Sequence, residues 1–437
     1  MKRYAMDSLI KWKSKAGRMP LIISGVRQAG KTWLMKEFGR LHFQNVAYVN
    51  LDSNPRMKEL FQSSLEPETI IHGIQLETGE KIIPDKSLII FDEVQEVPRA
   101  LTALKYFNEN SPKYHITAAG SLLGVALHQG TSFPVGNVEF LNLHPMSFFE
   151  YLEAAGESGI VDAVKSGDYK MAEIFKSKLT DWLKKYYFTG GMPGVVKAFH
   201  ESQDYDTVRA KQTDILRSYE NDFFKHMSPE TAVRTGMLWN SMPAQLSKEN
   251  HKFVYGVIKE GARAREYEMS IAWLSDCGMV NRVSRIKKPE IPLKAFEDTS
   301  AFKLYICDVG LLSAMCGLKK EMLLEGNRIY AEFKGALTEQ YVLQQMLAAG
   351  IDSIYYWAPS GSRAEVDFVV ESGGMIVPVE AKAEQNLHAK SLKTYIGKFK
   401  PDAAVRTSMA GFGKNGAIQN IPLYMIQELG QVIKPEK

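Results

Sequence analysis

The sequence predicts an α/β protein whose first part is built on a parallel sheet, and two observations carry this prediction. Short apolar runs recur through the first third of the chain, and stretches with helical periodicity separate them. Strands that are apolar on both faces and alternate with helices are typical of a parallel sheet covered on both sides. We expect such strands at residues 21–24, 46–49, 88–91 and 115–118, followed by a more alternating strand at 138–143.

Composition narrows the class of protein. A chain of 437 residues has room for about three domains of ordinary size. The net charge of +4 is too mild to imply a polyanionic partner by itself. Three cysteines are too few for a disulfide framework or a Cys-rich metal site, so a reducing cytosol is the simplest location. Charges interrupt the N-terminal segment and no long apolar run follows, so we expect a cytoplasmic protein without a signal peptide or a membrane span.

The chain divides into three expected domains, at residues 1–152, 153–290 and 291–437. The first holds the strands named above, and the second is mostly helical by its apolar period. Towards residue 290 a helical pattern stops at Gly278 and is followed by a strand at 280–286, an order that suits a winged helix-turn-helix. The third domain combines one long helix with several strands, which predicts a further α/β domain.

A glycine-rich loop follows the first strand. Residues 25–32 read Gly-Val-Arg-Gln-Ala-Gly-Lys-Thr, which matches the Walker A pattern. Glycines let backbone amides turn inward around a phosphate, and the next helix directs its positive end at the same anion. Lys31 is placed to contact the β- and γ-phosphates, and the Thr32 hydroxyl to ligate Mg²⁺. The nucleotide-binding residues that we expect are Gly25, Val26, Arg27, Gln28, Ala29, Gly30, Lys31, Thr32 and Trp33.

A second motif, which is acidic, completes the expected ATP site. The apolar run at 88–91 ends in Asp92 and Glu93, the Walker B arrangement. Asp92 would hold the Mg²⁺ shell together with Thr32, and Glu93 would be the general base that polarises the attacking water. Taken without the first motif, an acidic pair at a strand end is often only a solvated loop.

The expected strand that begins at Val46, and that we extend to Leu51, lies in sequence between the two motifs. The branch of P-loop folds that has a catalytic glutamate also has an inserted strand at this place. Another strand ends near Ser121, which we select as the polar residue that senses the γ-phosphate, with Thr117 second. An ordinary capping serine is the alternative reading of Ser121.

Carboxylates and a lysine gather in the third domain. Asp367 opens one strand of an expected hairpin, and Glu380 and Lys382 close the next on one face. Glu339 on the preceding helix is a fourth candidate. Carboxylates that converge in this way bind Mg²⁺ or Mn²⁺, and a nearby lysine lowers the pKa of a metal-bound water, as in restriction-type nucleases. The alternative is a surface hairpin with an exposed salt bridge.

These motifs together resemble the prokaryotic AAA-family ATPases of the archaeal-ATPase type. The C-terminal domain of that family has no known function and is similar to the PD-(D/E)XK, restriction-endonuclease-like fold. The segments that carry the resemblance are Met19–Thr32, Phe91–Gln95, Ala119–Gly124, Phe133–Gly136, His144–Tyr151, Phe333–Glu339, Glu365–Phe368 and Pro378–Lys382.

The resemblance implies ATP binding and Mg²⁺-dependent hydrolysis by Lys31, Thr32, Asp92 and Glu93, but it does not settle nuclease activity. Many relatives carry a cation where this chain has Asn137, so an arginine finger would come from elsewhere, with Arg27 and Arg99 as candidates by position alone. ATPases of this kind often complete their site with a neighbouring subunit, so a homo-oligomer is expected.

Two functional hypotheses follow. In the first, an ATPase is coupled to a nuclease-like module that docks on double-stranded DNA through the winged helix. In the second, the chain is a nucleotide-operated switch that binds a protein partner, and the nuclease-like domain is an inactive scaffold. Added DNA should stimulate hydrolysis only under the first hypothesis.

Overall fold

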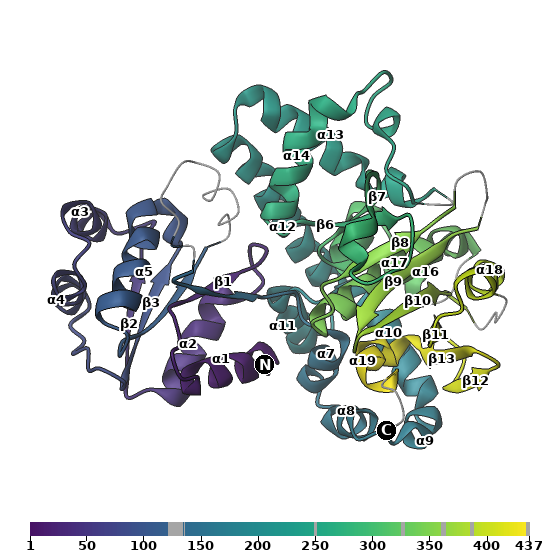
Figure 1. Cartoon of the computed structure of the whole chain (residues 1–437), viewed down its shortest axis with the longest axis horizontal. Coiled ribbons are helices and arrows are strands. Elements are labelled where there is room, and N and C mark those ends of the chain that lie inside the picture. The colour runs from purple at the N-terminus through teal and green to yellow at the C-terminus, as the bar shows by residue number, and fades with distance from the viewer. Residues whose placement is uncertain are drawn as a thin grey trace. The chain divides into compact units, whose positions relative to one another are not determined.

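The computed structural model describes residues 1–120, 134, 136–248, 251–324, 328–359, 364–384 and 389–433. The described chain falls into two compact units (Figure 1). One comprises Lys2–His144 together with Ala272–Met279, and the other comprises Pro145–Ile271 and Val280–Lys437, with Met1 assigned to it as well. We call them the N-terminal unit and the C-terminal unit.

The N-terminal unit contains the expected parallel sheet. Its order is β2-β3-β4-β1-β5, and every neighbouring pair is parallel. The strand β4 therefore lies between β1, which precedes the glycine loop, and β3, which ends in the acidic pair. The bounds are β1 Leu21–Ser24, β2 Asn45–Asn50, β3 Ser87–Asp92, β4 His115–Ala119 and β5 Glu139–Asn142.

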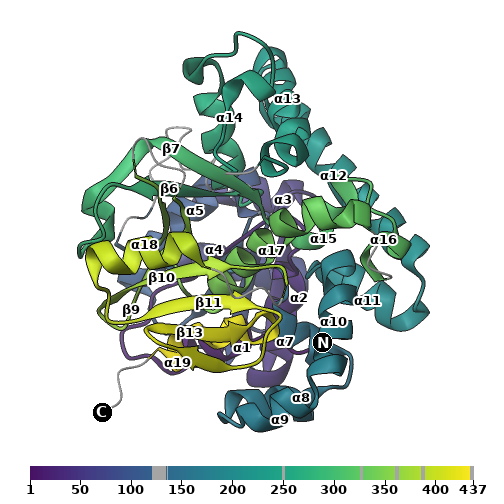
Figure 2. The same ribbon diagram turned by 90° about the vertical axis from the view of Figure 1, so that its right-hand side faces the viewer.

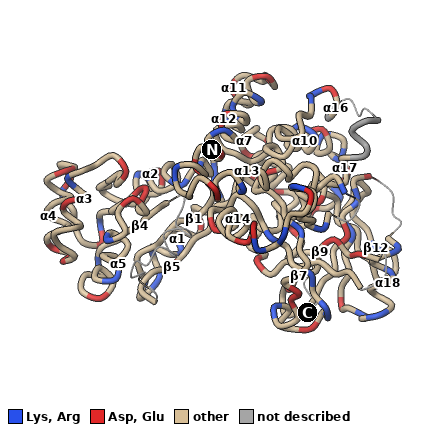
Figure 3. The backbone as a smooth tube through the Cα atoms, turned by 90° about the horizontal axis from the view of Figure 1, so that it is seen from above, with Lys and Arg blue, Asp and Glu red and all other residues tan. Residues whose placement is uncertain are grey.

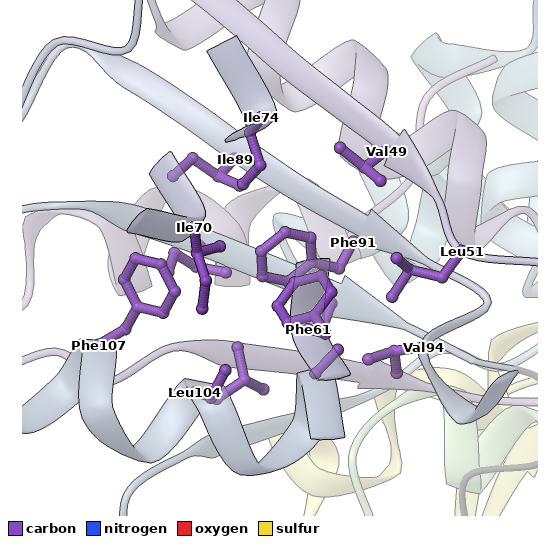
Figure 4. Packing of buried hydrophobic residues seen from close by; sticks show 14 of the residues in the cluster. Val49, Leu51, Phe61, Ile70, Ile74, Ile89, Phe91, Val94, Leu104 and Phe107 are labelled. Atoms are coloured by element: carbon purple, nitrogen blue, oxygen red, sulfur yellow. The ribbon is translucent and has the colours of Figure 1, made fainter. Parts of the chain in front are cut away.

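Helices cover both faces of this sheet, which explains why its strands are apolar throughout. On one face Phe61 packs edge-on against Phe91, with 5.4 Å between ring centroids, in a cluster that also holds Ile70 and Leu104 (Figure 4). On the other face α2 approaches so closely that a Cβ on its Gly39 would lie 2.5 Å from Val46. The helices of this unit are α1 Ala5–Ser14, α2 Lys31–His42, α3 Pro55–Ser63, α4 Pro67–Thr78 and α5 Pro98–Asn110, with the short turn η1 Val94–Glu96.

The C-terminal unit begins with helices. A capping box starts α7, because the Ser147 amide donates to Glu150 Oε2 at 2.8 Å and the Glu150 amide donates to Ser147 Oγ at 3.2 Å. The helical elements up to the sheet are α7 Phe148–Ala154, α8 Ser158–Lys165, α9 Tyr169–Ile174, α10 Lys176–Thr189, α11 Pro193–Ser202, α12 Tyr205–His226, α13 Pro229–Leu246, η2 Tyr255–Val257 and α14 Ala264–Asp276. The expected helical region is confirmed.

An eight-stranded mixed sheet forms the rest of this unit, in the order β12-β13-β11-β10-β9-β8-β6-β7. The strand that the sequence suggested as a wing, β6, lies inside this sheet with β8 on one side and β7 on the other. The domain boundary expected at residue 290 therefore falls between two paired strands. The strand bounds are β6 Val280–Ile286, β7 Glu297–Ile306, β8 Ile354–Trp357, β9 Val366–Ser372, β10 Met375–Ala381, β11 Ala404–Ser408, β12 Gly413–Asn415 and β13 Ile418–Pro422.

Two helices fix this sheet from different sides (Figure 2). The ring of Tyr395 on α18 lies 5.2 Å from that of Trp357 on β8, edge to face, in the apolar core under α18. On α17, the Gln340 side chain accepts from the Ile306 amide at 3.0 Å and donates to the Ile306 carbonyl at 2.6 Å, which fastens the helix to β7. The remaining elements are η3 Leu293–Phe296, α15 Val309–Met315, α16 Lys320–Leu324, α17 Arg328–Ala348, α18 Lys390–Phe399, η4 Leu423–Glu428 and α19 Leu429–Val432.

Two general features of the described residues are the hydropathy of their helices and the distribution of their charges. None of the helices in that part of the chain is long and apolar enough to cross a membrane. Blue basic and red acidic segments are scattered over the tube in Figure 3, in agreement with the mild net charge of +4.

Candidate ATP site and carboxylate cluster

The glycine loop has the backbone shape that its sequence requires. Gly25 has φ 141° and Gly30 has φ 94°, values that residues with a Cβ rarely adopt. A Cβ on Gly25 would also lie 2.2 Å from the carbonyl oxygen of Leu143. The loop leaves β1 at Ser24 and enters α2 at Lys31, so the first amides of α2 and those of the loop belong to one continuous turn.

Lys31 is buried beneath this loop and bonded to it. Its Nζ donates to the carbonyl oxygens of Gly25 at 2.7 Å and Val26 at 3.1 Å, and the residue is 6% exposed. Burial lowers the pKa of Lys31 to about 8, although the nearby Glu93 and Asp92 oppose the shift. The side chain is therefore an ammonium group near neutral pH that water barely solvates, which is suited to an anionic ligand.

Asp92 accepts hydrogen bonds from two hydroxyl groups. Thr32 Oγ1 donates to its Oδ2 at 2.7 Å, as the two motifs predict, and the Tyr48 hydroxyl donates to the same oxygen at 2.9 Å. Burial and the Asp92 carboxylate raise the pKa of Tyr48 to about 12, so the phenol keeps its proton. Sequence reasoning missed Tyr48. It lies on β2, two residues before the position that pairs with Asp92, and this pairing could not be read from the sequence.

Glu93 follows Asp92 in a left-handed conformation with φ 51°. A non-glycine residue in this region is held there by its surroundings at a cost of about 1 kcal/mol or more. Its Oε2 accepts a hydrogen bond from Gln95 Nε2 at 2.7 Å. Gln95, also missed, therefore orients the proposed base.

Arg3 braces the glycine loop, and no local motif marks it. Its Nη1 donates to the Ala29 carbonyl at 2.9 Å and its Nη2 to the His144 carbonyl at 2.6 Å, while the residue is 6% exposed. One guanidinium thus ties the loop to the segment that follows β5.

The turn at Cys277 and Gly278 belongs to the same unit and lies against the loop. A Cβ on Gly278, which has φ 70°, would be 3.3 Å from the Val26 amide nitrogen. Cys277 is close enough for its thiolate form to raise the pKa of Lys31. This contact joins residues about 250 positions apart, so sequence periodicity could not reveal it.

Other expected residues have different surroundings. Trp33 is 45% exposed in the first turn of α2, and Thr117 is buried on β4 with a hydroxyl that has no hydrogen-bond partner among the described residues. Arg99 Nε donates to the Phe61 carbonyl at 2.8 Å, and Asn137 Oδ1 accepts from Asn108 Nδ2 at 2.8 Å. Ser121 lies outside the described residues.

The carboxylates expected in the third domain do come together, in the C-terminal unit. The hairpin of β9 and β10 turns at Gly373 and Gly374, which both have positive φ, and the Asp367 Oδ2 atom accepts from the Ala381 amide at 2.8 Å. Glu380 accepts from Lys382 Nζ at 2.7 Å. Burial and then Glu339 raise the pKa of Asp367 well above its usual value, which places Glu339 within electrostatic reach.

A second lysine, Lys303 of β7, lies among these carboxylates and was not predicted. It is 0% exposed, and its Nζ lies 2.6 Å from Glu365 Oε1 and 3.5 Å from Glu339 Oε2. Burial alone would lower the pKa of Lys303, but the surrounding carboxylates raise it. Among the described residues, no three His, Cys, Asp or Glu side chains are arranged to hold a metal ion. The Mg²⁺ or Mn²⁺ expected here remains a prediction.

The N-terminal unit has the organisation of a P-loop ATPase: a parallel sheet, a glycine loop that runs into a helix, and a hydroxyl–carboxylate pair beside a buried lysine. Residues 17–152 match the family described as "AAA domain". Two domains of unknown function match later parts of the chain, DUF8612 at residues 180–322 and DUF4143 at residues 334–426. The search of curated proteins gave no match.

Several solved structures align with much of this chain at low identity. The Walker-type ATPase PABY2304 of Pyrococcus abyssi is 14% identical, with 71% of this chain and 94% of that one covered and a TM-score of 0.43. The Aeropyrum pernix ORC2 protein in its ADP form is 14% identical, with 76% and 92% covered and a TM-score of 0.33. The Aeropyrum pernix ORC1 protein in complex with DNA is 12% identical, with 73% and 93% covered and a TM-score of 0.28.

Proposed function

We propose that this chain binds MgATP in the glycine loop and hydrolyses it. The observation that carries the proposal is the 2.7 Å hydrogen bond from Thr32 Oγ1 to Asp92 Oδ2, beside the buried ammonium of Lys31. A hydroxyl and a carboxylate oxygen at this spacing are the oxygen ligands that Mg²⁺ accepts, and the remaining coordination positions would be left to water and phosphate.

Each side chain has one role in this proposal. Lys31 exchanges its bonds to the loop carbonyls for phosphate oxygens, and the loop amides bind the β-phosphate. Thr32 and Asp92 would hold magnesium, which would supply charge neutralisation on the phosphates. Glu93, oriented by Gln95, accepts a hydrogen bond from water and then its proton as the water oxygen attacks the γ-phosphorus and ADP leaves.

Calorimetry with ATP and Mg²⁺ tests the binding step. We expect saturable binding by the native chain and none by Lys31→Ala, because the buried charge that faces the phosphates is gone. Lys113→Ala is the matched control, since Lys113 is exposed at the opposite end of β4 from the loop. Binding that survives in Lys31→Ala would contradict the assignment of the site.

Release of phosphate, followed with malachite green, tests the hydrolysis step. We expect turnover that needs Mg²⁺ and disappears when EDTA is added. Tight binding of ATP without any phosphate release would leave the chain as a nucleotide-dependent switch, the second hypothesis drawn from the sequence.

We propose duplex DNA as the partner of the C-terminal unit. Five basic residues are exposed around α14 and β6, whereas Arg285 is committed to Asp298 at 2.5 Å. The exposed residues are Arg263, Arg265, Arg282, Lys287 and Lys288. Exposed cations of this kind contact phosphates without reading sequence.

The DNA proposal is tested with the double variant Lys287→Ala/Lys288→Ala. Each lost phosphate contact should reduce the slope of log affinity against log salt by about 0.9. The double variant Lys390→Ala/Lys393→Ala removes the same charge from exposed positions on α18 and should leave affinity nearly unchanged. Equal losses of DNA affinity in the two double variants would show that binding depends on the net charge alone and not on the position of the lysines. No DNA binding in low salt and no effect of DNA on hydrolysis would favour a protein partner.

A further inference from the structure

The carboxylate cluster of the C-terminal unit already contains a cation that belongs to the protein. Lys303 lies on β7, the last strand of the sheet, where it pairs with Val283 of β6, and none of its surface is exposed. Its Nζ atom is 2.6 Å from Glu365 Oε1 and 3.5 Å from Glu339 Oε2. An ammonium group at these distances makes charge-assisted hydrogen bonds with carboxylates from two different elements.

The Glu339 oxygen that faces Lys303 is heavily used by protein donors. Besides the ammonium, Glu339 Oε2 accepts from the Tyr305 hydroxyl at 2.8 Å and lies 2.8 Å from His251 Nδ1. Tyr305 and Lys303 are two residues apart on β7, so period 2 places both on the side of Glu339. A divalent ion that bound this oxygen would displace the protein donors from it. Because these donors are buried, water could not replace the hydrogen bonds that they lose.

The two remaining carboxylates are also bonded to their own hairpin and to the following helix. Asp367 Oδ2 accepts from the Ala381 amide at 2.8 Å. Glu380 Oε1 lies 2.7 Å from Lys382 Nζ, and its Oε2 accepts from the Leu392 amide at 3.0 Å in the first turn of α18. Glu380 thus stabilises the start of a helix as well as a neighbouring charge.

We propose that Lys303 is the resident cation of this cluster, and that Glu339, Glu365 and Asp367 form a closed internal ion network instead of a divalent-metal site. A metal ion at the same place would add two positive charges beside a buried ammonium, and it would compete with protein donors for Glu339 Oε2, Glu365 Oε1 and Asp367 Oδ2. The acidic pattern of a nuclease is kept in this network, but it serves to hold β7, α17 and β9 together.

Binding of Mn²⁺ to the full chain without nucleotide tests the proposal. The free ion is followed by electron paramagnetic resonance through the millimolar range, in the native chain and in Asp367→Asn, which preserves the shape of the side chain. Any Mn²⁺ bound at the ATP site is the same in both proteins, so a difference between the two binding isotherms would come from the carboxylate cluster. We expect superimposable isotherms. A Mn²⁺ site that is present in the native chain and lost in Asp367→Asn would overturn the proposal.

Removal of the resident cation is the complementary test. Lys303→Met leaves Glu339 and Glu365 without their ammonium, so we expect a lower melting temperature that millimolar Mn²⁺ raises, while Mn²⁺ leaves the native melting temperature unchanged. Lys382→Met, which removes a partly exposed lysine, is the control and should show little response to Mn²⁺. Stability of Lys303→Met equal to that of the native chain would contradict the role of Lys303. If Lys303→Met does not fold, that loss supports the role, and the Asp367→Asn comparison still decides on the metal.

Discussion

Thr32 and Asp92 are joined by a 2.7 Å hydrogen bond although 60 positions separate them in the chain. The bond connects the first turn of α2 to the end of β3, and it sets the distance between the phosphate-binding loop and the acidic pair. Because the Tyr48 hydroxyl donates to the same carboxylate oxygen at 2.9 Å, Asp92 keeps its orientation when Thr32 moves towards a ligand.

Thr32→Val should distinguish the effect of the hydroxyl group on MgATP binding from the effect of the side-chain shape. The variant keeps the volume of the side chain but loses the hydroxyl oxygen that would ligate Mg²⁺, together with the donor to Asp92. We expect weaker binding of MgATP by about 10- to 100-fold, with metal-free ATP affected far less. Calorimetry with and without EDTA measures both, and Thr32→Ser should restore most of the affinity.

Glu93→Gln should keep nucleotide binding and suppress turnover. An amide cannot accept the proton of the attacking water, so phosphate release should fall by about 100-fold or more. Glu109→Gln at the exposed end of α5 is the control. Hydrolysis at the native rate in Glu93→Gln would show that another group is the base.

The affinity for ATP should fall as the pH rises above 8. Burial lowers the pKa of Lys31 to about 8, so the free protein loses this proton at higher pH, while phosphate oxygens would retain it in the complex. Binding should therefore take up a proton above pH 8 and none well below it. Calorimetry in two buffers of different ionisation enthalpy, on either side of pH 8, measures the uptake, which Lys31→Ala should abolish.

The lowered pKa of Lys31 should make the affinity for ATP fall as the pH rises, but it should make the free energy of unfolding of the nucleotide-free protein rise. The unfolded chain holds this proton up to the ordinary lysine pKa of 10.5, so between pH 8 and 10.5 the unfolded state binds more protons than the folded state. The contribution of Lys31 to the free energy of unfolding should therefore rise with pH in this range. The difference between native and Lys31→Ala unfolding curves isolates it.

Arg3→Ala should loosen the glycine loop. It removes hydrogen bonds to the Ala29 and His144 carbonyls, and the free energy of unfolding should fall by about 1–3 kcal/mol. We expect weaker ATP binding as well, because the loop must then be ordered by the ligand. Lys11→Ala, an exposed position on α1, should leave both quantities unchanged.

The N-terminal unit was largely predictable because local sequence determines its parts. Strands apolar on both faces can only be buried, and the spacing of glycines, Lys31 and Thr32 specifies the turn. Tyr48 and Arg3 were not predictable in the same way, since their roles depend on which strand lies beside β3 and on how the N-terminal segment packs.

The C-terminal unit was harder to predict for a physical reason. The run that forms β7 contains Lys303, and a lysine within a strand normally indicates a solvent-facing position. Its burial is possible only because Glu339 and Glu365 arrive from other elements. The boundary expected at residue 290 lies in the connection between β6 and β7, two strands that pair with each other.

The position of β6 between β8 and β7 has a practical consequence for the design of fragments of this chain. A fragment that starts at residue 291 would lack β6, so the backbone groups of β8 that pair with Arg285 and Ile286 would become an open edge. An unpaired edge of this kind recruits strands from other molecules and promotes aggregation. Fragments that begin before Val280 should remain monodisperse in size-exclusion chromatography where shorter ones precipitate.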